Sequence, residues 1–186
     1  MIAIDQATST GIAIVGYENK GPAVYLKSAR VKLPIKSRMH WYAIACETIA
    51  KLFDEMGMAY PSFSHPEQIQ WVIENWSHHR NFRDATRLAQ IQQVWIDIAA
   101  AMRAEKEPVL YHVQSWQASI GAGSLKSKIH GPKARKEHAQ LWAEKSYRLD
   151  EPIHHDIADA LCMASVWIME NRHKQESFGF RTKAIG

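Results

Sequence analysis

Residues 1–16, MIAIDQATSTGIAIVG, open the chain with two apolar runs that a short polar turn separates. Their β-branched residues predict a strand that ends at Asp5, a turn rich in threonine and serine, and a second strand. Residues 23–33, AVYLKSARVKL, predict a third strand. Three strands in succession with short connections favour an antiparallel meander at the start of the domain.

Helical and strand patterns alternate along the rest of the chain. Apolar residues at helical spacing predict helices over residues 39–56, 88–102 and 134–147, and a last helix that begins near residue 156. Short apolar runs predict two more strands over residues 69–75, IQWVIEN, and 108–113, PVLYHV. This order predicts an α/β protein with a five-stranded mixed sheet flanked by helices.

The length and composition fit one compact domain. The chain has 186 residues, of which 46% are hydrophobic, enough for a normal core. We expect residues 1–170 to form the domain and residues 171–186, which lose the apolar pattern, to form a partly disordered tail. Residues 120–133 contain three glycines and several lysines and predict a mobile basic loop. No run of eighteen apolar residues and no signal-like start are present, so we expect a soluble cytoplasmic protein without a membrane segment.

Four carboxylates stand at the ends of predicted elements. Asp5 closes the first strand, Glu74 closes the fourth, and Asp156 and Asp159 open the last helix. Strand ends and adjoining helix termini form the usual functional crevice of an α/β sheet. Helix positions three apart are separated by about 60° around the axis, so the two aspartates point to the same side. The sequence therefore predicts that the four carboxylates share one pocket.

A cluster of four acids needs a cation. Like charges at that density repel and raise one or more pKa values unless positive charge neutralises them. All-oxygen clusters suit Mg²⁺, with Mn²⁺ as the alternative, and two such ions can activate a water and stabilise the leaving oxygen in phosphodiester cleavage. The net charge of +4 is also unevenly placed, because residues 124–148 carry seven Lys or Arg against two Glu. Acids, metal and a basic segment together point to a nuclease.

Each acid also has a structural explanation. Asp5 could accept hydrogen bonds from the turn that follows it. Glu74 could pair with Arg80 or Arg83, and Asp156 could be a first-turn charge that the helix macrodipole favours.

The histidine pairs are similarly open. His154 and His155, like His78 and His79, are either polar surface residues or supports for metal ligands.

Several motifs match a known family. Residues 2–15, 71–76, 80–94, 112–123 and 154–164 resemble successive segments of RuvC-type Holliday junction resolvases, nucleases of the RNase H-like superfamily. The resemblance runs from Ile2 to about Ile168 at low identity. It implies an RNase H-like fold and metal-dependent cleavage of four-way DNA junctions by a symmetric homodimer. It also implies that Asp5, Glu74, Asp156 and Asp159 are the catalytic metal ligands, and that a lysine assists, with Lys136 the best match and Lys133 the next.

The chain departs from the family in two places. The usual glycine-rich turn after the first aspartate is QATSTG, which retains Gly11, and the basic loop is longer than in cellular relatives. Both features indicate a phage-encoded or otherwise divergent member.

DNA contacts are expected from the basic segment and from aromatic residues after Glu74. Cations would neutralise phosphates, and aromatic side chains would stack at a junction centre. The residues are Lys126, Lys128, Lys133, Arg135, Lys136, Trp76, His79, Arg80 and Phe82. The alternatives are a solvated helix face for the basic residues and core packing for Trp76, while Trp95 is expected in the core or a dimer interface.

Four other functions are compatible with parts of the sequence. Another RNase H-like nuclease, acting on other branched DNA or on RNA, is the strongest rival. A sugar kinase is disfavoured by length, and an HD-type phosphohydrolase would be all-helical. A non-catalytic junction-binding module is disfavoured because a carboxylate cluster hinders DNA binding. The expectation is a Mg²⁺-dependent crossover junction endodeoxyribonuclease with two ions in each active site.

Overall fold

A computed structural model describes residues 1–17, 23–33, 38–56, 69–75, 82–102, 106–125 and 127–183; for residues 38, 82–83, 127–132 and 173–183 it describes the backbone only. The elements are β1 (Ile2–Asp5), β2 (Ser9–Gly16), β3 (Val24–Lys32), α1 (Arg38–Glu55), β4 (Trp71–Asn75), α2 (Phe82–Ala101), β5 (Val109–His112), α3 (Val113–Ser119), the 3-10 turn η2 (Ala122–Ser124), α4 (Ser127–Tyr147) and α5 (His155–Lys183). No helix in the described part of the chain combines the length and the apolar character needed to cross a membrane.

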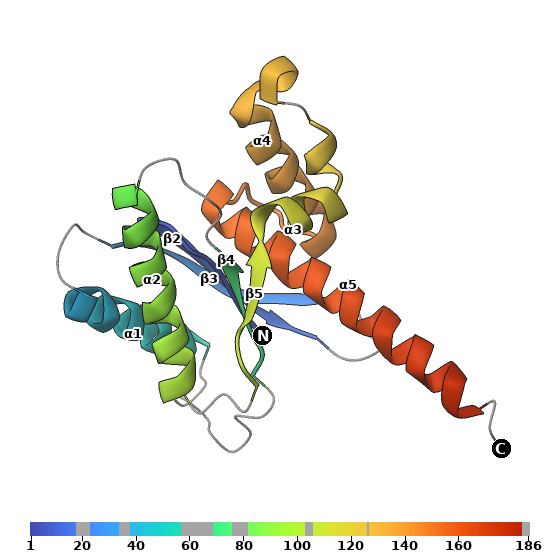
Figure 1. The fold of residues 1–186 in the computed structure, drawn as a ribbon, viewed down its shortest axis with the longest axis horizontal. Coiled ribbons are helices and arrows are strands. Elements are labelled where there is room, and N and C mark those ends of the chain that lie inside the picture. Colours follow the sequence, from blue (N-terminus) through green and yellow to red (C-terminus); the bar gives the residue numbers. More distant parts are fainter. Residues whose placement is uncertain are drawn as a thin grey trace.

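The sheet has the strand order β3-β2-β1-β4-β5 (Figure 1). The first three strands form the antiparallel meander, with Asp5 of β1 opposite Gly11 of β2. β4 pairs parallel with β1, and β5 pairs parallel with β4. The predicted five-stranded mixed sheet with an antiparallel first half is confirmed. Because β1 and β4 run the same way side by side, their acidic ends come to the same edge.

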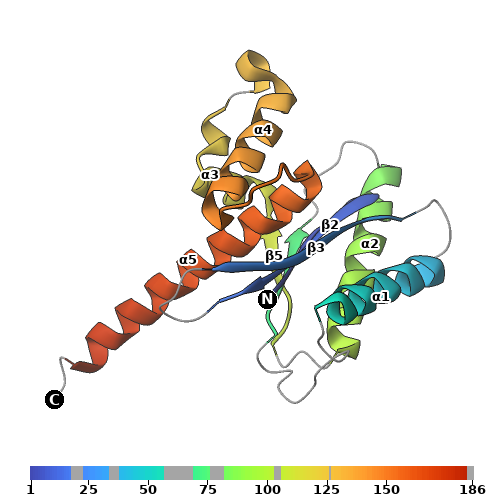
Figure 2. The same ribbon diagram turned by 180° about the vertical axis from the view of Figure 1, so that it is seen from behind.

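Two hydrophobic cores lie on opposite faces of this sheet. Helices α1 and α2 cover one face, whereas α3, α4 and α5 lie on the other (Figures 1 and 2). Alternation along the strands sends Ile2 and Ile4 toward α1 and α2, and Ala3 toward α5. Each fully buried isoleucine side chain contributes roughly 1.5–3 kcal/mol of hydrophobic free energy.

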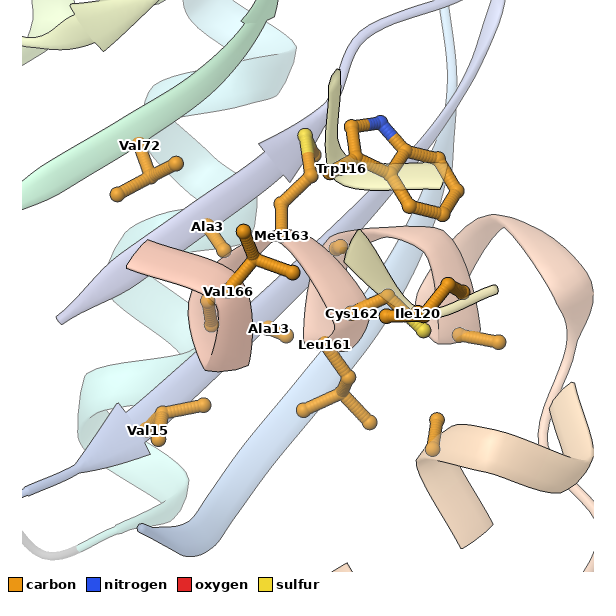
Figure 3. Packing of buried hydrophobic residues seen from close by; sticks show 14 of the residues in the cluster. Ala3, Ala13, Val15, Val72, Trp116, Ile120, Leu161, Cys162, Met163 and Val166 are labelled. Atoms are coloured by element: carbon orange, nitrogen blue, oxygen red, sulfur yellow. The ribbon is translucent and has the colours of Figure 1, made fainter. Parts of the chain in front are cut away.

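Small residues let α5 lie close to the strands. Ala3 of β1 and Ala13 of β2 are fully buried beneath α5, whose Leu161 and Met163 are also fully buried (Figure 3). Gly11 of β2 is closer still, since a Cβ there would lie 2.0 Å from the carbonyl oxygen of Asp156. The start of α5, with its acidic residues, therefore rests directly on β2.

The prediction of a loop over residues 120–133 was wrong in part. β5 ends at His112, and the next residues form α3, the turn η2 and the first turns of α4, which begins at Ser127. The helix α3 has seven residues, of which Trp116 alone is buried, so it carries no repeating apolar stripe. In α4, Gly131 and Pro132 lie inside the helix. Because glycine and proline are typical of loops, they led to the wrong prediction for this segment.

The last helix is longer than its apolar pattern. α5 continues to Lys183, beyond Met169, where the pattern ends. The side chains of residues 173–183 lie outside the described part, and the division into a domain and a tail stays a prediction.

Candidate active site

The structure brings the four predicted carboxylates together. Asp5 ends β1, Glu74 is the fourth residue of the neighbouring parallel strand β4, and Asp156 and Asp159 lie in the first turns of α5. The Asp5 and Glu74 carboxyls share a hydrogen bond, Asp156 acts electrostatically on Asp5, and Asp5 and Asp156 act on Asp159. The turn after β1 is closed by Thr10, whose hydroxyl donates to the carbonyl of Ala7 at 2.7 Å.

Burial and crowding favour the protonated forms of Asp5, Glu74 and Asp159. Burial and the neighbouring Glu74 and Asp156 raise the pKa of Asp5 well above its usual range. Burial is also the main cause that raises the pKa of Glu74 to about 7 and that of Asp159 to about 8. Asp5 and Glu74 share a hydrogen bond, so the pair holds a proton between its two carboxyl groups. Such a cluster favours a cation that replaces the protons.

One lysine outside the cluster adjusts its charge. Lys136 of α4 lowers the pKa of both Asp5 and Asp159 through its positive charge, although its own side chain is exposed. Lys133, the other lysine that the sequence suggested, instead lies 3.4 Å from the carboxylate of Glu137. The geometry therefore favours Lys136 as the lysine of the site.

Neighbouring helices fix Glu74 in place. The fully buried Trp116 of α3 lowers the pKa of Glu74, although its indole N–H forms no regular hydrogen bond within the described part of the chain. Gln92 of α2 donates through its amide to the Glu74 carbonyl oxygen at 3.3 Å. Arg80 and the side chain of Arg83, the alternative partners for this acid, lie outside the described residues.

Asp156 has a different environment from the other three acids. Its Oδ2 accepts hydrogen bonds from Ser9 Oγ at 2.7 Å and from Arg30 Nε at 3.0 Å. Its Oδ1 lies 3.0 Å from His155 Nε2. Asp156 therefore has a cationic partner of its own, contributed by the edge strand β3, besides being a first-turn acid of α5.

The histidines before α5 contact Asp156. The backbone N–H of Asp156 donates to His154 Nδ1 at 3.2 Å, and the two histidine rings stack with centroids 4.0 Å apart. Ligand atoms of His154, His155 and Asp156 lie within 4.8 Å of one another, a spacing at which they could hold a metal ion. Burial is the main cause that lowers the pKa of His155, which favours its neutral form. Their contacts fit support of Asp156 better than simple surface exposure; His78 and His79 lie outside the described residues.

The raised pKa values predict that Mg²⁺ stabilises the protein more at pH 8 than at pH 6. Without metal, the folded acids keep protons that the unfolded chain has released, so their contribution to stability is lost as pH rises from about 4 through 7 to 8. Mg²⁺ at about 100 times its Kd should raise the Tm by roughly 5–10 °C near pH 8. At pH 6 protons compete with the ion, so we expect less than half that shift.

Thermal unfolding in Mg²⁺ and in EDTA at both pH values measures this effect. The difference between the two solutions cancels the titration of acids elsewhere in the chain. An equal or larger shift at pH 6 would contradict the assignment of these acids as a cation site.

The predicted DNA-binding residues are described only in part. Lys126, Trp76, His79, Arg80 and the side chains of Lys128 and Phe82 lie outside the described residues. Of the others, Lys133 and Lys136 are exposed on α4, and Arg135 donates from Nε to the carbonyl of Leu125 at 2.9 Å. Arg135 also lines a pocket of about 410 Å³ with Gln114, Gln117, Ala118, Gly121, Gly123 and Ser124. Trp95, which was expected in the core or in a dimer interface, is fully buried in the core against α1.

Comparison with known proteins rests on structure. The chain matches no protein-family model and none of the curated proteins. Among solved structures it is similar to Thermus thermophilus RuvC in complex with a Holliday junction substrate, with a TM-score of 0.64 and 16% identity over 94% of each chain. It is also similar to a second T. thermophilus RuvC structure, with a TM-score of 0.62 and 20% identity over 95% of each chain. The chain has the RuvC fold.

The RuvC fold confirms the resemblance that the motifs indicated. Both likenesses cover nearly the whole chain, so the fold includes the sheet, the acidic strand ends and α5. In this fold the acids that are 69 to 154 residues apart in sequence become neighbours at one sheet edge. The RNase H-like architecture expected from the sequence is therefore correct.

Sequence reasoning missed four residues that contact the acids of this RuvC fold. They are Ser9, Arg30, Gln92 and Trp116. The available signal was Ser9 in the polar turn beside Asp5 and the alternation that places Arg30 on one face of β3. Neither pattern identifies the distant side chain that Ser9 or Arg30 contacts.

Proposed function

We propose that this protein is a metal-dependent, structure-selective endonuclease that resolves four-way DNA junctions by paired nicks. The observation that carries the proposal is the convergence of Asp5, Glu74, Asp156 and Asp159 beside Lys136 on a RuvC fold. The junction itself comes from the similar RuvC, which was solved with a Holliday junction substrate. As catalytic residues we propose these five.

The residues present fit a divalent cation. The donors in the cluster are carboxylate oxygens, which Mg²⁺ and Mn²⁺ prefer. Burial is the main cause that raises the pKa values of Asp5, Glu74 and Asp159, and a bound cation would favour their charged forms. The four acids would hold two ions, with His154 and His155 supporting Asp156. Bound there, the metal supplies an activated water and stabilisation of the leaving oxygen.

The chain's own residues prepare this chemistry. When a cation binds, the Asp5–Glu74 pair would release its shared proton to solvent water, so both carboxylates would become available as ligands. Lys136 offsets negative charge that grows on the phosphate in the transition state. The fully buried Trp116 lies against Glu74 and keeps bulk water from that side of the cluster. Solvent access remains at the edge where Lys136 is exposed.

Paired nicks require two active sites. The described part of one chain contains one cluster of four converging acids, so we propose a homodimer with one site in each subunit. A cytoplasmic location and a phage origin belong to the same proposal; they rest on the absence of a spanning helix in the described residues and on the departures from the family turn.

A labelled four-way junction tests the proposed function. The protein is incubated with the junction, a linear duplex, a flap and an RNA–DNA hybrid, each with Mg²⁺, Mn²⁺ or EDTA. We expect symmetric nicks in the junction, at least about tenfold faster than in the other substrates, and none in EDTA. Preferred cleavage of the flap or hybrid would instead support the alternative, an RNase H-like nuclease for other branched DNA or RNA. Binding without cleavage in any metal would support a junction-binding module.

A further inference from the structure

Arg30 lies at the rim of the carboxylate site without being one of its acids. It is on β3, where its cross-strand partner on β2 is Gly11. Because Gly11 has no side chain, Arg30 can extend across β2 to the start of α5, where it meets Asp156. The residue is 126 positions from Asp156 in sequence, so the sheet alone brings the two together.

The arginine uses only one of its nitrogens for these contacts. Nε donates to Ser9 Oγ at 2.7 Å and to Asp156 Oδ2 at 3.0 Å. Ser9 Oγ in turn donates to the same Asp156 oxygen at 2.7 Å, which closes a triangle of three polar groups. The guanidinium is therefore held at its inner edge.

The outer edge of the guanidinium has no partner among the residues that the structure describes. Within the described residues the two terminal nitrogens have no partner, and 37% of the Arg30 side chain is exposed. An arginine whose purpose is to neutralise a carboxylate usually offers two parallel N–H groups to its two oxygens. Here one nitrogen contacts one oxygen, and the remaining donors stay available to a ligand.

We propose that Arg30 binds a substrate phosphate beside the carboxylate cluster through its two terminal nitrogens, with Ser9 and Asp156 holding it in position. This rests on the proposed function, because it assumes that a phosphodiester is brought to this edge. The planar pair of N–H donors matches two oxygens of one phosphate, which a single ammonium group cannot do. Arg30 adds a second cation, from a different element, to the one that Lys136 supplies.

Lys27 provides a matched control on the same strand. Its side chain is 38% exposed, almost the same as that of Arg30, and it lies 2.9 Å from Glu55 of α1 on the other face of the sheet. Lys27→Gln and Arg30→Gln each remove one positive charge from β3, but only the second removes it from the site.

Equilibrium binding of the full chain to a four-way junction in EDTA, over a range of salt, tests the proposal. We expect Arg30→Gln to weaken binding about tenfold and to lower the slope of log Kd against log salt by about one. Lys27→Gln should change the affinity less than about twofold. Arg30→Lys should bind about as weakly as Arg30→Gln, since its single ammonium is taken up by Asp156 and Ser9. Ser9→Ala keeps the guanidinium but loosens it, and we expect a loss of about threefold.

Two results would overturn the proposal. Arg30→Gln that binds as tightly as Lys27→Gln would show that Arg30 only orients Asp156. Arg30→Lys with wild-type affinity and slope would rule out the paired contact. If Arg30→Gln fails to fold, as judged by its thermal transition, Arg30→Lys and Ser9→Ala decide the question alone. A wild-type protein that binds DNA but cleaves no junction in Mg²⁺ would refute the proposed function and leave the phosphate contact to be judged by these affinities.

Discussion

Asp5→Asn should abolish junction cleavage in Mg²⁺ while leaving junction binding as tight as in the wild type or tighter. Asp5 is buried, with 8% of its surface exposed, and Glu74, Asp156 and Lys136 act on it electrostatically. The amide has the size of a protonated carboxyl, so the fold is retained, but it gives a metal one oxygen and no charge. Loss of several kcal/mol of metal-derived stabilisation corresponds to a rate at least about a thousandfold lower.

Asp54→Asn is the matched control for this variant. Asp54 is exposed on α1, across the sheet from the cluster, so the same change in charge there should leave cleavage within about twofold of wild type. A single-turnover assay under saturating protein compares the chemical step in the two variants. Asp5→Asn should also raise the stability of the metal-free protein near pH 8, because it removes an acid whose ionisation the fold opposes. Cleavage by Asp5→Asn at even a tenth of the wild-type rate would refute a catalytic role for Asp5.

The sequence contained most of the information needed for the sheet and its acids. The first strand pattern ends in Asp5, and the strand pattern of residues 69–75 has Glu74 next to its end. A parallel pairing of these two strands is enough to make the two acids neighbours. Asp156 and Asp159 could be assigned to the same site because helix residues three positions apart lie on the same face. These steps depend on local periodicity and on general properties of sheets.

Contacts between distant side chains could not be derived in this way. The triangle of Ser9, Arg30 and Asp156 joins three elements, and it depends on how deeply α5 rests on β2. No periodicity encodes that depth. The helix α3 was missed for a related reason. Its one buried residue, Trp116, packs into the core, so tertiary contacts stabilise the helix and its sequence has no repeating apolar pattern.

Among the described glycines, Gly11 should tolerate an added methyl group least, so Gly11→Ala should be strongly damaging. An ideal Cβ at Gly11 would lie 2.0 Å from the Asp156 carbonyl oxygen and 2.8 Å from the backbone nitrogen of Ile157. Favourable contacts need about 3.5 Å or more, so either β2 or the start of α5 must move. We expect a loss of about 1–3 kcal/mol in the free energy of unfolding. Displacing the start of α5 by about an ångström should also slow cleavage at least a hundredfold or so, because the Asp156 and Asp159 carboxylates move with it.

Gly16→Ala separates this steric effect from the general effect of replacing a glycine in β2. Its Cβ would meet Leu26 Cδ1 at 3.5 Å, an ordinary contact, and the less flexible unfolded chain should make the variant neutral or up to about 1 kcal/mol more stable. Urea unfolding and junction cleavage, measured on both variants, give the comparison. Because backbone atoms rather than flexible side chains oppose the methyl group at Gly11, local repacking cannot relieve the clash. Equal stability and equal cleavage in the two variants would mean that α5 does not rest on β2 in solution, and the proposed juxtaposition of Asp156 with Asp5 would fail with it.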